Sequence, residues 1–199
     1  MTLRKVVNYL VLTLAVAQLL LILGSWFVTA AWPDLPMRSL LSSEGIRWLF
    51  GTFAQNLLTP LLAWLILGSV AYGAVVSCGL TELRRPFTFR QRSALRFVAV
   101  EALLFLVALL LLTLIPQAPL LSATGQLFPS AFSDGLVPFL CFAVTVIALT
   151  FGLTTARLNT LSDIVHSLTV GFSKCASLFL LYIFAATFYF SLCYFLDSR

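Results

Sequence analysis

Residues 97–115, FVAVEALLFLVALLLLTLI, decide the fold class of this chain. The stretch is almost entirely apolar, and Glu101 is its one charged residue. A helix that crosses the hydrocarbon core of a membrane uses about 20 predominantly apolar residues. In lipid the stretch has to be helical, because its backbone N–H and C=O groups find no water to bond. It therefore predicts a transmembrane helix.

Four further stretches have the same character, and the five predicted spans cover residues 6–31, 57–80, 97–115, 136–153 and 178–196. The first is longer than the roughly 7–15 apolar residues of a signal peptide, so we expect a retained helix. The sequence predicts an all-α, polytopic integral membrane protein. We expect one transmembrane domain over residues 1–199.

The composition supports this fold class. The 199 residues are 61% hydrophobic and 10% charged, with a mean hydropathy of +1.05. Soluble domains are typically about 45–50% apolar and about 25% charged. This difference excludes a water-soluble globular domain, a disordered segment and a nucleic-acid-binding module.

Two other segments, 43–55 and 160–174, are amphipathic, with apolar residues at helical spacing. We expect two helices that lie at the membrane interface, one on each side. The alternative is that each is the first part of a long tilted span. Ser42 or Ser43 can cap the first helix, and Thr160 and Asp163 have the spacing of a capping box.

The basic residues predict the orientation. Nine of the twelve lie on one side of the predicted spans: Arg4, Lys5, Arg84, Arg85, Arg90, Arg92, Arg96, Arg157 and Lys174. Only Arg38, Arg47 and Arg199 fall on the other side. By the positive-inside rule, the N-terminus is cytoplasmic and the C-terminus lies outside. The group Arg84, Arg85, Arg90, Arg92 and Arg96 then forms a basic cytoplasmic loop.

Glu101 is the one acid within a predicted span, and an intramembrane carboxylate is a candidate functional residue. The alternative is structural: Glu101 lies near the predicted cytoplasmic end of its span. There it could reach the interface or pair with an arginine of the preceding loop. The shallow depth favours this second interpretation.

Ser69, Gly73 and Ser77 recur every four residues along the second span. Small residues at this spacing let helix backbones approach closely. We expect a packing seam within the chain, with a dimer interface as the alternative.

The sequence offers no catalytic machinery. It contains one histidine, His166, and seven acids, and its four cysteines have no metal-ligand spacing. Catalytic triads and nucleotide-binding motifs are also missing. We therefore expect no enzyme activity, no metal and no cofactor.

Several collinear segments resemble one family. They are LLSSEGIRW at 40–48, PQAPLLSATGQLFPSAF at 116–132, Phe-Gly at 151–152, Asp-Ile at 163–164 and FAATF at 184–188. Together they are similar to segments of the p-aminobenzoyl-glutamate (AbgT-type) transporter family. The resemblance also includes single positions between these segments: Asn56, Pro60, Leu61, Gly73, Gly79 and Leu80. Ala71, Val76 and Thr187 depart from the family pattern, which has a glycine, an acid and a glutamine at these positions.

The resemblance implies a short form of that family. Its members are about twice as long, with nine spans and two re-entrant hairpins that build the substrate and cation site. The first hairpin region would fall between Leu80 and the third span, where this chain has its basic loop. The chain ends at Arg199, before the second. No substrate-binding residue of the family can be assigned here. We expect a naturally short chain, because it starts at Met1 and its five spans form a coherent topology.

Two functions follow as hypotheses. The favoured one is a non-catalytic subunit or scaffold in the bacterial inner membrane, which contacts lipid and either another membrane protein or a second copy of itself. The alternative is a transporter of a small organic anion that works as an oligomer or with a partner chain.

Overall fold

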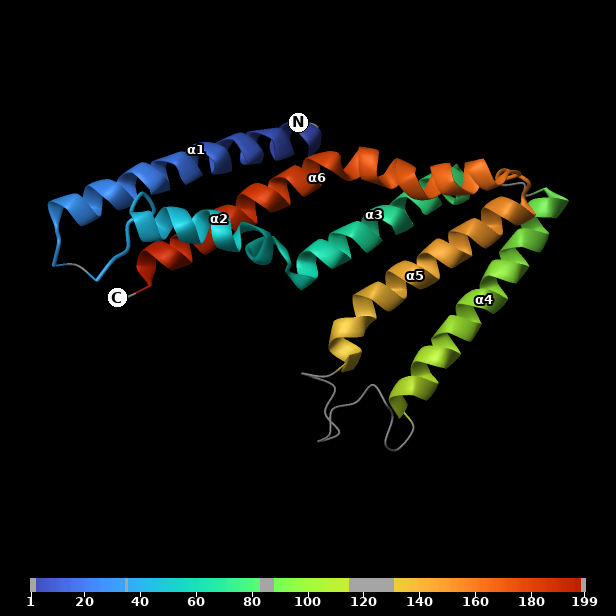
Figure 1. Cartoon of the computed structure of the whole chain (residues 1–199). Helices are drawn as coiled ribbons and strands as arrows, with labels where there is room; N and C mark the ends of the chain where they lie inside the picture. Colours follow the sequence, from blue (N-terminus) through green and yellow to red (C-terminus); the bar gives the residue numbers. More distant parts are fainter. Residues whose placement is uncertain (1–2, 35, 83–87, 115–130, 198–199) are drawn as a thin grey trace. The chain divides into compact units, whose positions relative to one another are not determined.

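A computed structural model describes residues 3–34, 36–82, 88–114 and 131–197. These residues form helices and connecting turns, with no strand among them. The helices are α1 (Leu3–Ala31), α2 (Ser43–Leu57), α3 (Pro60–Cys78), the 3₁₀ turn η1 (Leu80–Glu82), α4 (Phe89–Leu114), α5 (Ala131–Thr154) and α6 (Leu161–Leu196) (Figure 1). The predicted all-α fold class is confirmed.

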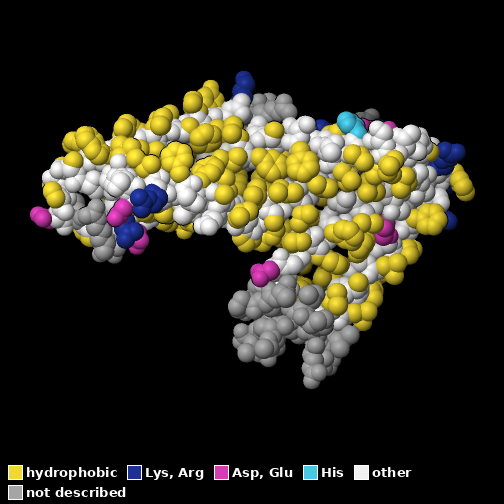
Figure 2. Space-filling model, viewed as in Figure 1, with side chains coloured by type: hydrophobic (Ala, Val, Ile, Leu, Met, Phe, Trp, Pro, Cys, Tyr) yellow, Lys and Arg dark blue, Asp and Glu magenta, His cyan; other side chains and the backbone are white. Residues whose placement is uncertain are grey.

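Five helices, α1, α3, α4, α5 and α6, are long and apolar enough to cross a membrane. This matches the five predicted spans. Large apolar side chains remain exposed on these helices, and Figure 2 shows them covering much of the visible face of the protein. Exposed apolar surface of this extent is typical of helices whose solvent is lipid.

The separate interfacial helix expected at 160–174 is wrong, and the alternative, the first part of a longer helix, is what the structure has. Residues 160–174 run without a break into the fifth span as part of α6, whose 36 residues extend roughly 54 Å. No proline or glycine lies between Lys174 and Leu178 to end the helix. The predicted capping box is confirmed: the Asp163 N–H donates to Thr160 Oγ1 at 3.1 Å, and the Thr160 N–H donates to Asp163 Oδ2 at 2.9 Å.

The first amphipathic segment is a helix of its own, α2. It begins after Ser42, whose side chain accepts a hydrogen bond from the Gly45 N–H at 3.0 Å. Of the two residues expected as caps, Ser42 takes the role. The following turn ends α2 before Pro60, which opens α3 as its first residue, where a missing N–H costs little.

The chain divides into two compact units by its contacts. One comprises Met1–Leu62 with Cys175–Arg199, and the other comprises Ala63–Lys174. In the first unit Gln18 Nε2 donates to Ser191 Oγ at 2.9 Å, and both side chains are buried. Interhelical hydrogen bonds of this kind hold helices together in lipid. The single transmembrane domain stays a prediction.

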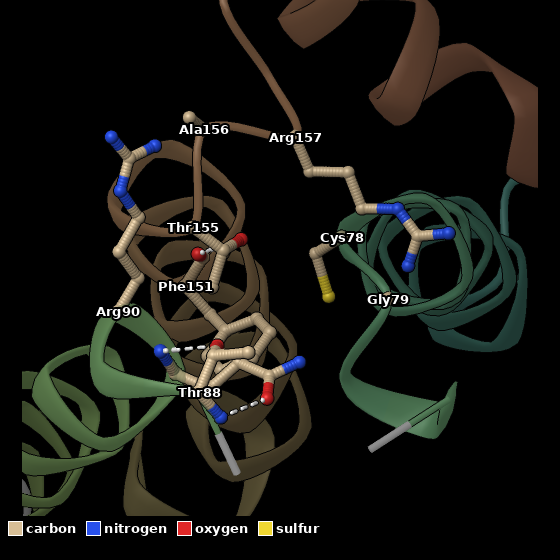
Figure 3. Close-up of a pocket in the computed structure, with 9 residues that line it drawn as sticks. Cys78, Gly79, Thr88, Arg90, Phe151, Thr155, Ala156 and Arg157 are labelled. Atoms are coloured by element: carbon tan, nitrogen blue, oxygen red, sulfur yellow. Dashed lines mark hydrogen bonds between the residues drawn. The ribbon is translucent and has the colours of Figure 1, made fainter. Parts of the chain in front are cut away.

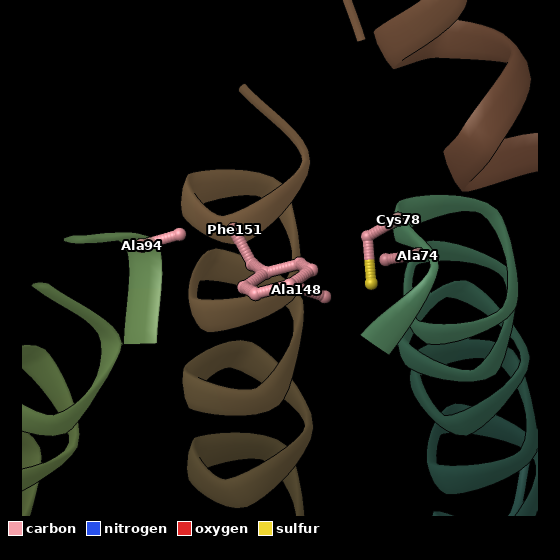
Figure 4. Close-up of a cluster of buried hydrophobic side chains, with 5 residues drawn as sticks. All are labelled: Ala74, Cys78, Ala94, Ala148 and Phe151. Atoms are coloured by element: carbon pink, nitrogen blue, oxygen red, sulfur yellow. The ribbon is translucent and has the colours of Figure 1, made fainter. Parts of the chain in front are cut away.

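The second unit has a core of small side chains around one aromatic ring. Phe151 of α5 is 2% exposed and packs with Ala148 of the same helix, with Ala74 and Cys78 of α3, and with Ala94 of α4 (Figure 4). Three alanines and a cysteine let the helices approach, and Phe151 fills the space between them. This core fixes the ends of α3, α4 and α5 that form the cavity described next.

Candidate functional site

A polar cavity of about 310 Å³ lies in the second unit, where α3 and α5 end and α4 begins (Figure 3). Its walls come from three separate stretches of the chain: Cys78 and Gly79; Thr88, Arg90 and Gln91; Phe151, Thr155, Ala156 and Arg157. Buried Cys78 and Phe151 close its apolar side, and polar side chains line the rest.

Sharp backbone turns shape the cavity. Gly79 ends α3 with φ of 80°, and Ala156 follows α5 with φ of 57°. On the facing side, Thr88 and Gln91 form a capping box that starts α4. The Thr88 N–H donates to Gln91 Oε1 at 2.9 Å, and the Gln91 N–H donates to Thr88 Oγ1 at 3.4 Å. The end of α3, the end of α5 and the start of α4 therefore each fix one wall of the cavity.

Two arginines line the cavity, and one of them pairs with an acid. Arg157 donates to Glu82 Oε2 at 2.6 Å, and its side chain packs directly over Gly79, where a Cβ would overlap the guanidinium. Arg90 is exposed in the first turn of α4 and makes no ion pair within the described residues. Among the described residues that line the cavity, none has an acidic side chain.

The predicted basic loop is partly helical, which corrects the sequence interpretation. Arg90, Arg92 and Arg96 lie on the first turns of α4, and Arg84 and Arg85 lie outside the described residues. The capping box at Thr88 starts the helix about two turns before the apolar run begins. Hydropathy marks where a helix enters lipid, whereas the cap marks where the helix itself begins.

Glu101 faces α5. Its Oε1 accepts a hydrogen bond from Thr150 Oγ1 at 3.2 Å, and its Oε2 is buried without a hydrogen-bond partner. Within the described residues its partner is thus a hydroxyl of the neighbouring span rather than an arginine. A half-buried carboxyl with one weak bond is a costly arrangement in apolar surroundings.

Replacing Glu101 with glutamine should therefore leave the protein as stable as before, or more stable. The amide keeps an oxygen that accepts from Thr150 and removes a charge that is costly to bury. We expect a thermal unfolding midpoint in detergent within about 2 °C of the parent, or higher, since 1 kcal/mol shifts a protein of this size by about 2–4 °C. Glu44→Gln, at an exposed acid of α2, is the control. A clear fall for Glu101→Gln alone would mean that the charge itself is needed.

The predicted packing seam of α3 contacts two small residues of α6. Ser69 and Gly73 of α3 meet Ser167 and Gly171 of α6 within the second unit. An added methyl carbon on Gly73 would lie 2.6 Å from the Gly171 nitrogen and 2.7 Å from the Ser167 carbonyl oxygen. Ser77, the third predicted residue, is half-buried. Ser167 and Gly171 were missed, although they repeat the four-residue spacing.

Sequence reasoning also missed Thr150 and Arg157 as site residues. Thr150 looked like one more small hydroxyl in an apolar run. Arg157 was used only to predict the orientation of the spans. Its position directly after a span was the one sign in the sequence that it could line a cavity at the end of that helix. No cluster of three histidine, cysteine or acidic residues that could hold a metal occurs in the described ranges.

Comparison with known protein families decides the identity. Residues 79–198 match the AbgT putative transporter family, which is more than half of the chain. This chain belongs to the AbgT family. The resemblance inferred from the sequence is confirmed. Its segments from Pro116 onward lie within the matched residues, and those before Gly79 lie outside them. The match contains α4, α5 and α6, together with most of the cavity walls.

The fold of this AbgT-family chain is also found among solved structures. It is similar to the YdaH transporter of Alcanivorax borkumensis, with a TM-score of 0.74 and 14% sequence identity. The similarity covers 93% of this chain and 70% of that one. At this identity the likeness shows the fold alone. No curated protein sequence matches the chain. The chain is thus a multi-pass membrane protein of a transporter family, in keeping with the expectation that it is not a classical enzyme.

Proposed function

We propose that this AbgT-family chain serves as a membrane subunit or scaffold of a larger complex, and that one copy does not carry cargo by itself. The observation that carries the proposal is the continuity of its five long helices. Transporter sites are typically built from broken helices whose free N–H and C=O groups face a polar substrate. Here α5 stays one helix even at Pro138.

The polar side chains of the spans support the same proposal, because their hydrogen bonds stay within the chain. Thr113 donates to the Leu109 carbonyl at 2.9 Å, and Thr145 donates to the Cys141 carbonyl at 2.7 Å. Gln18 likewise uses its amide nitrogen on Ser191 of the same unit. Within the described residues only Gln18 Oε1 and Glu101 Oε2 are buried side-chain atoms without a hydrogen-bond partner. Two such atoms are few for a site that would hold a charged solute.

Purification of the intact complex tests the proposal. A tagged chain is extracted from its membrane in mild detergent, and the mass and composition of the assembly are measured by native mass spectrometry. If the chain is a scaffold, the purified complex should contain a second membrane protein at fixed stoichiometry. That complex should persist when excess untagged chain is present during extraction to compete for the partner. A homogeneous preparation of this chain alone, as monomer or self-oligomer, would contradict it.

Family membership favours one second candidate, a transporter of a small organic anion. Because the described spans leave few free polar groups, such activity would need an oligomer or a partner chain to complete the site. Uptake that appears only when the purified partner is added would support this second function.

We also propose a bacterial inner-membrane location with a cytoplasmic N-terminus and an external C-terminus. Lys5 lies at the start of α1, Arg90, Arg92 and Arg96 at the start of α4, and Arg157 just after α5. With five crossings these positions share one side, which the positive-inside rule assigns to the cytoplasm.

Reporter fusions test this orientation. Alkaline phosphatase joined after the last residue should be active, because that enzyme folds only outside the cytoplasm, and green fluorescent protein at the same point should be dark. The matched fusions after Arg157 should give the reverse pair of signals. An active phosphatase after Arg157 would contradict the proposed orientation.

A further inference from the structure

We propose that the cavity between α3, α4 and α5 binds a phosphate group, carried by an anionic lipid or by a free phosphate compound. Arg90, Arg157, the Thr88 hydroxyl and the N-terminus of α4 lie around about 310 Å³ of space, whereas the Thr155 hydroxyl donates to the Phe151 carbonyl at 2.8 Å. A water molecule takes about 30 Å³ in the liquid, so a phosphate group and several waters fit.

The two guanidinium groups come from chain segments far apart in sequence. Figure 3 shows Arg90 and Arg157 on opposite sides of Thr155. Arg157 is positioned in advance, because Glu82 binds one of its nitrogens and Gly79 supports its side chain. The other donors of Arg157 stay available, since a guanidinium carries five N–H groups.

Arg90 supplies charge that nothing in the described chain neutralises. It sits in the first turn of α4, a helix of 26 residues that begins at the cavity. The N-terminus of a helix carries partial positive charge. Thr88 already caps the Gln91 N–H, so α4 contributes to the cavity chiefly through this dipole. The Arg90 side chain and the start of α4 therefore add to one positive field.

The position of the cavity fits a ligand at the membrane surface. It lies beyond the apolar stretches of α3 and α5, at the end of the spans where the arginines gather. Under the orientation proposed above, this end faces the cytoplasm. Basic pockets between helices on that side are suited to anionic lipid headgroups.

Lipid titrations monitored by native mass spectrometry test the proposal on the full chain in detergent. The probes are phosphatidylglycerol, zwitterionic phosphatidylcholine and inorganic phosphate. Arg90→Gln and Arg157→Gln should each weaken phosphatidylglycerol binding roughly tenfold or more, because each removes charge-assisted hydrogen bonds. Arg92→Gln is the matched control, with the same charge change on the same helix but outside the cavity lining.

The probes distinguish the two sources of the phosphate. Selective binding of phosphatidylglycerol that millimolar inorganic phosphate does not displace assigns a lipid headgroup, and displacement assigns a free phosphate compound. Arg90→Gln removes no ion pair between described residues, so this variant stays informative if Arg157→Gln is unstable. Equal weakening by Arg90→Gln and Arg92→Gln would overturn the proposal. So would the absence of Arg90-dependent binding of both phosphatidylglycerol and inorganic phosphate.

Discussion

Gly171→Ala will separate α3 from α6 at the seam and lower the stability of the protein. A methyl group on Gly171 would overlap the Ser69 carbonyl oxygen and lie 2.9 Å from the Gly73 nitrogen. These neighbours are backbone atoms of a helix, so they cannot move aside as a side chain would. Gly73→Ala meets the same obstacle from the other helix and should have the same effect.

Overpacking of this kind costs typically about 1–3 kcal/mol. We therefore expect the thermal unfolding midpoint in detergent to fall by roughly 2–12 °C, at about 2–4 °C per kcal/mol. Gly68→Ala is the matched control, because it lies on α3 with no atom within 4 Å of the added methyl group. Since alanine favours helix more than glycine does, the control should be neutral or stabilising. If Gly171→Ala, Gly73→Ala and Gly68→Ala all had the same unfolding midpoint, the close packing of α3 against α6 would be contradicted.

Phe151→Ala is expected to have the second large effect. The ring is 2% exposed in the core shared by α3, α4 and α5, so its removal leaves a cavity. The same change costs about 3–5 kcal/mol in soluble proteins. In lipid the hydrophobic transfer term is largely lost, which leaves packing and cavity terms of about 1–3 kcal/mol.

The matched control for Phe151 lies on the same helix. Phe142 is 59% exposed, and its ring packs edge to face against the Phe105 ring, with 6.0 Å between the two ring centroids. Phe142→Ala should lose only that contact, which is worth about 0.5–1.5 kcal/mol. Unfolding midpoints in one detergent check the difference, and a Phe142→Ala variant as unstable as Phe151→Ala would contradict the assigned core.

Hydropathy was sufficient to predict the five spans, because each must carry a long apolar run whatever its neighbours are. It was not sufficient to predict helix ends, which depend on local caps such as Thr88 with Gln91. It also left open whether residues 160–174 form a helix of their own, since both forms share the same apolar stripe. The continuous α6 depends on the absence of a breaker after Lys174.

The candidate site shows a different limit. The small residues of α3 predicted one side of a seam, but the partner in α6 depends on which helices pack together. The cavity likewise joins Gly79, Arg90 and Arg157, whose positions in the sequence give no sign that they meet. The basic residues at the ends of the spans lie in that region, but in the sequence they predicted the orientation in the membrane and not a cavity.

Uptake by proteoliposomes containing the purified chain alone tests the central claim most directly. Labelled p-aminobenzoyl-glutamate is supplied outside, with an inward sodium or proton gradient, and ionophore-treated and protein-free vesicles serve as controls. A chain whose helices are unbroken and bond most of their own polar groups predicts no accumulation above protein-free vesicles. Gradient-dependent accumulation that the ionophore abolishes would contradict the account, because one kind of chain would then hold a complete cargo site.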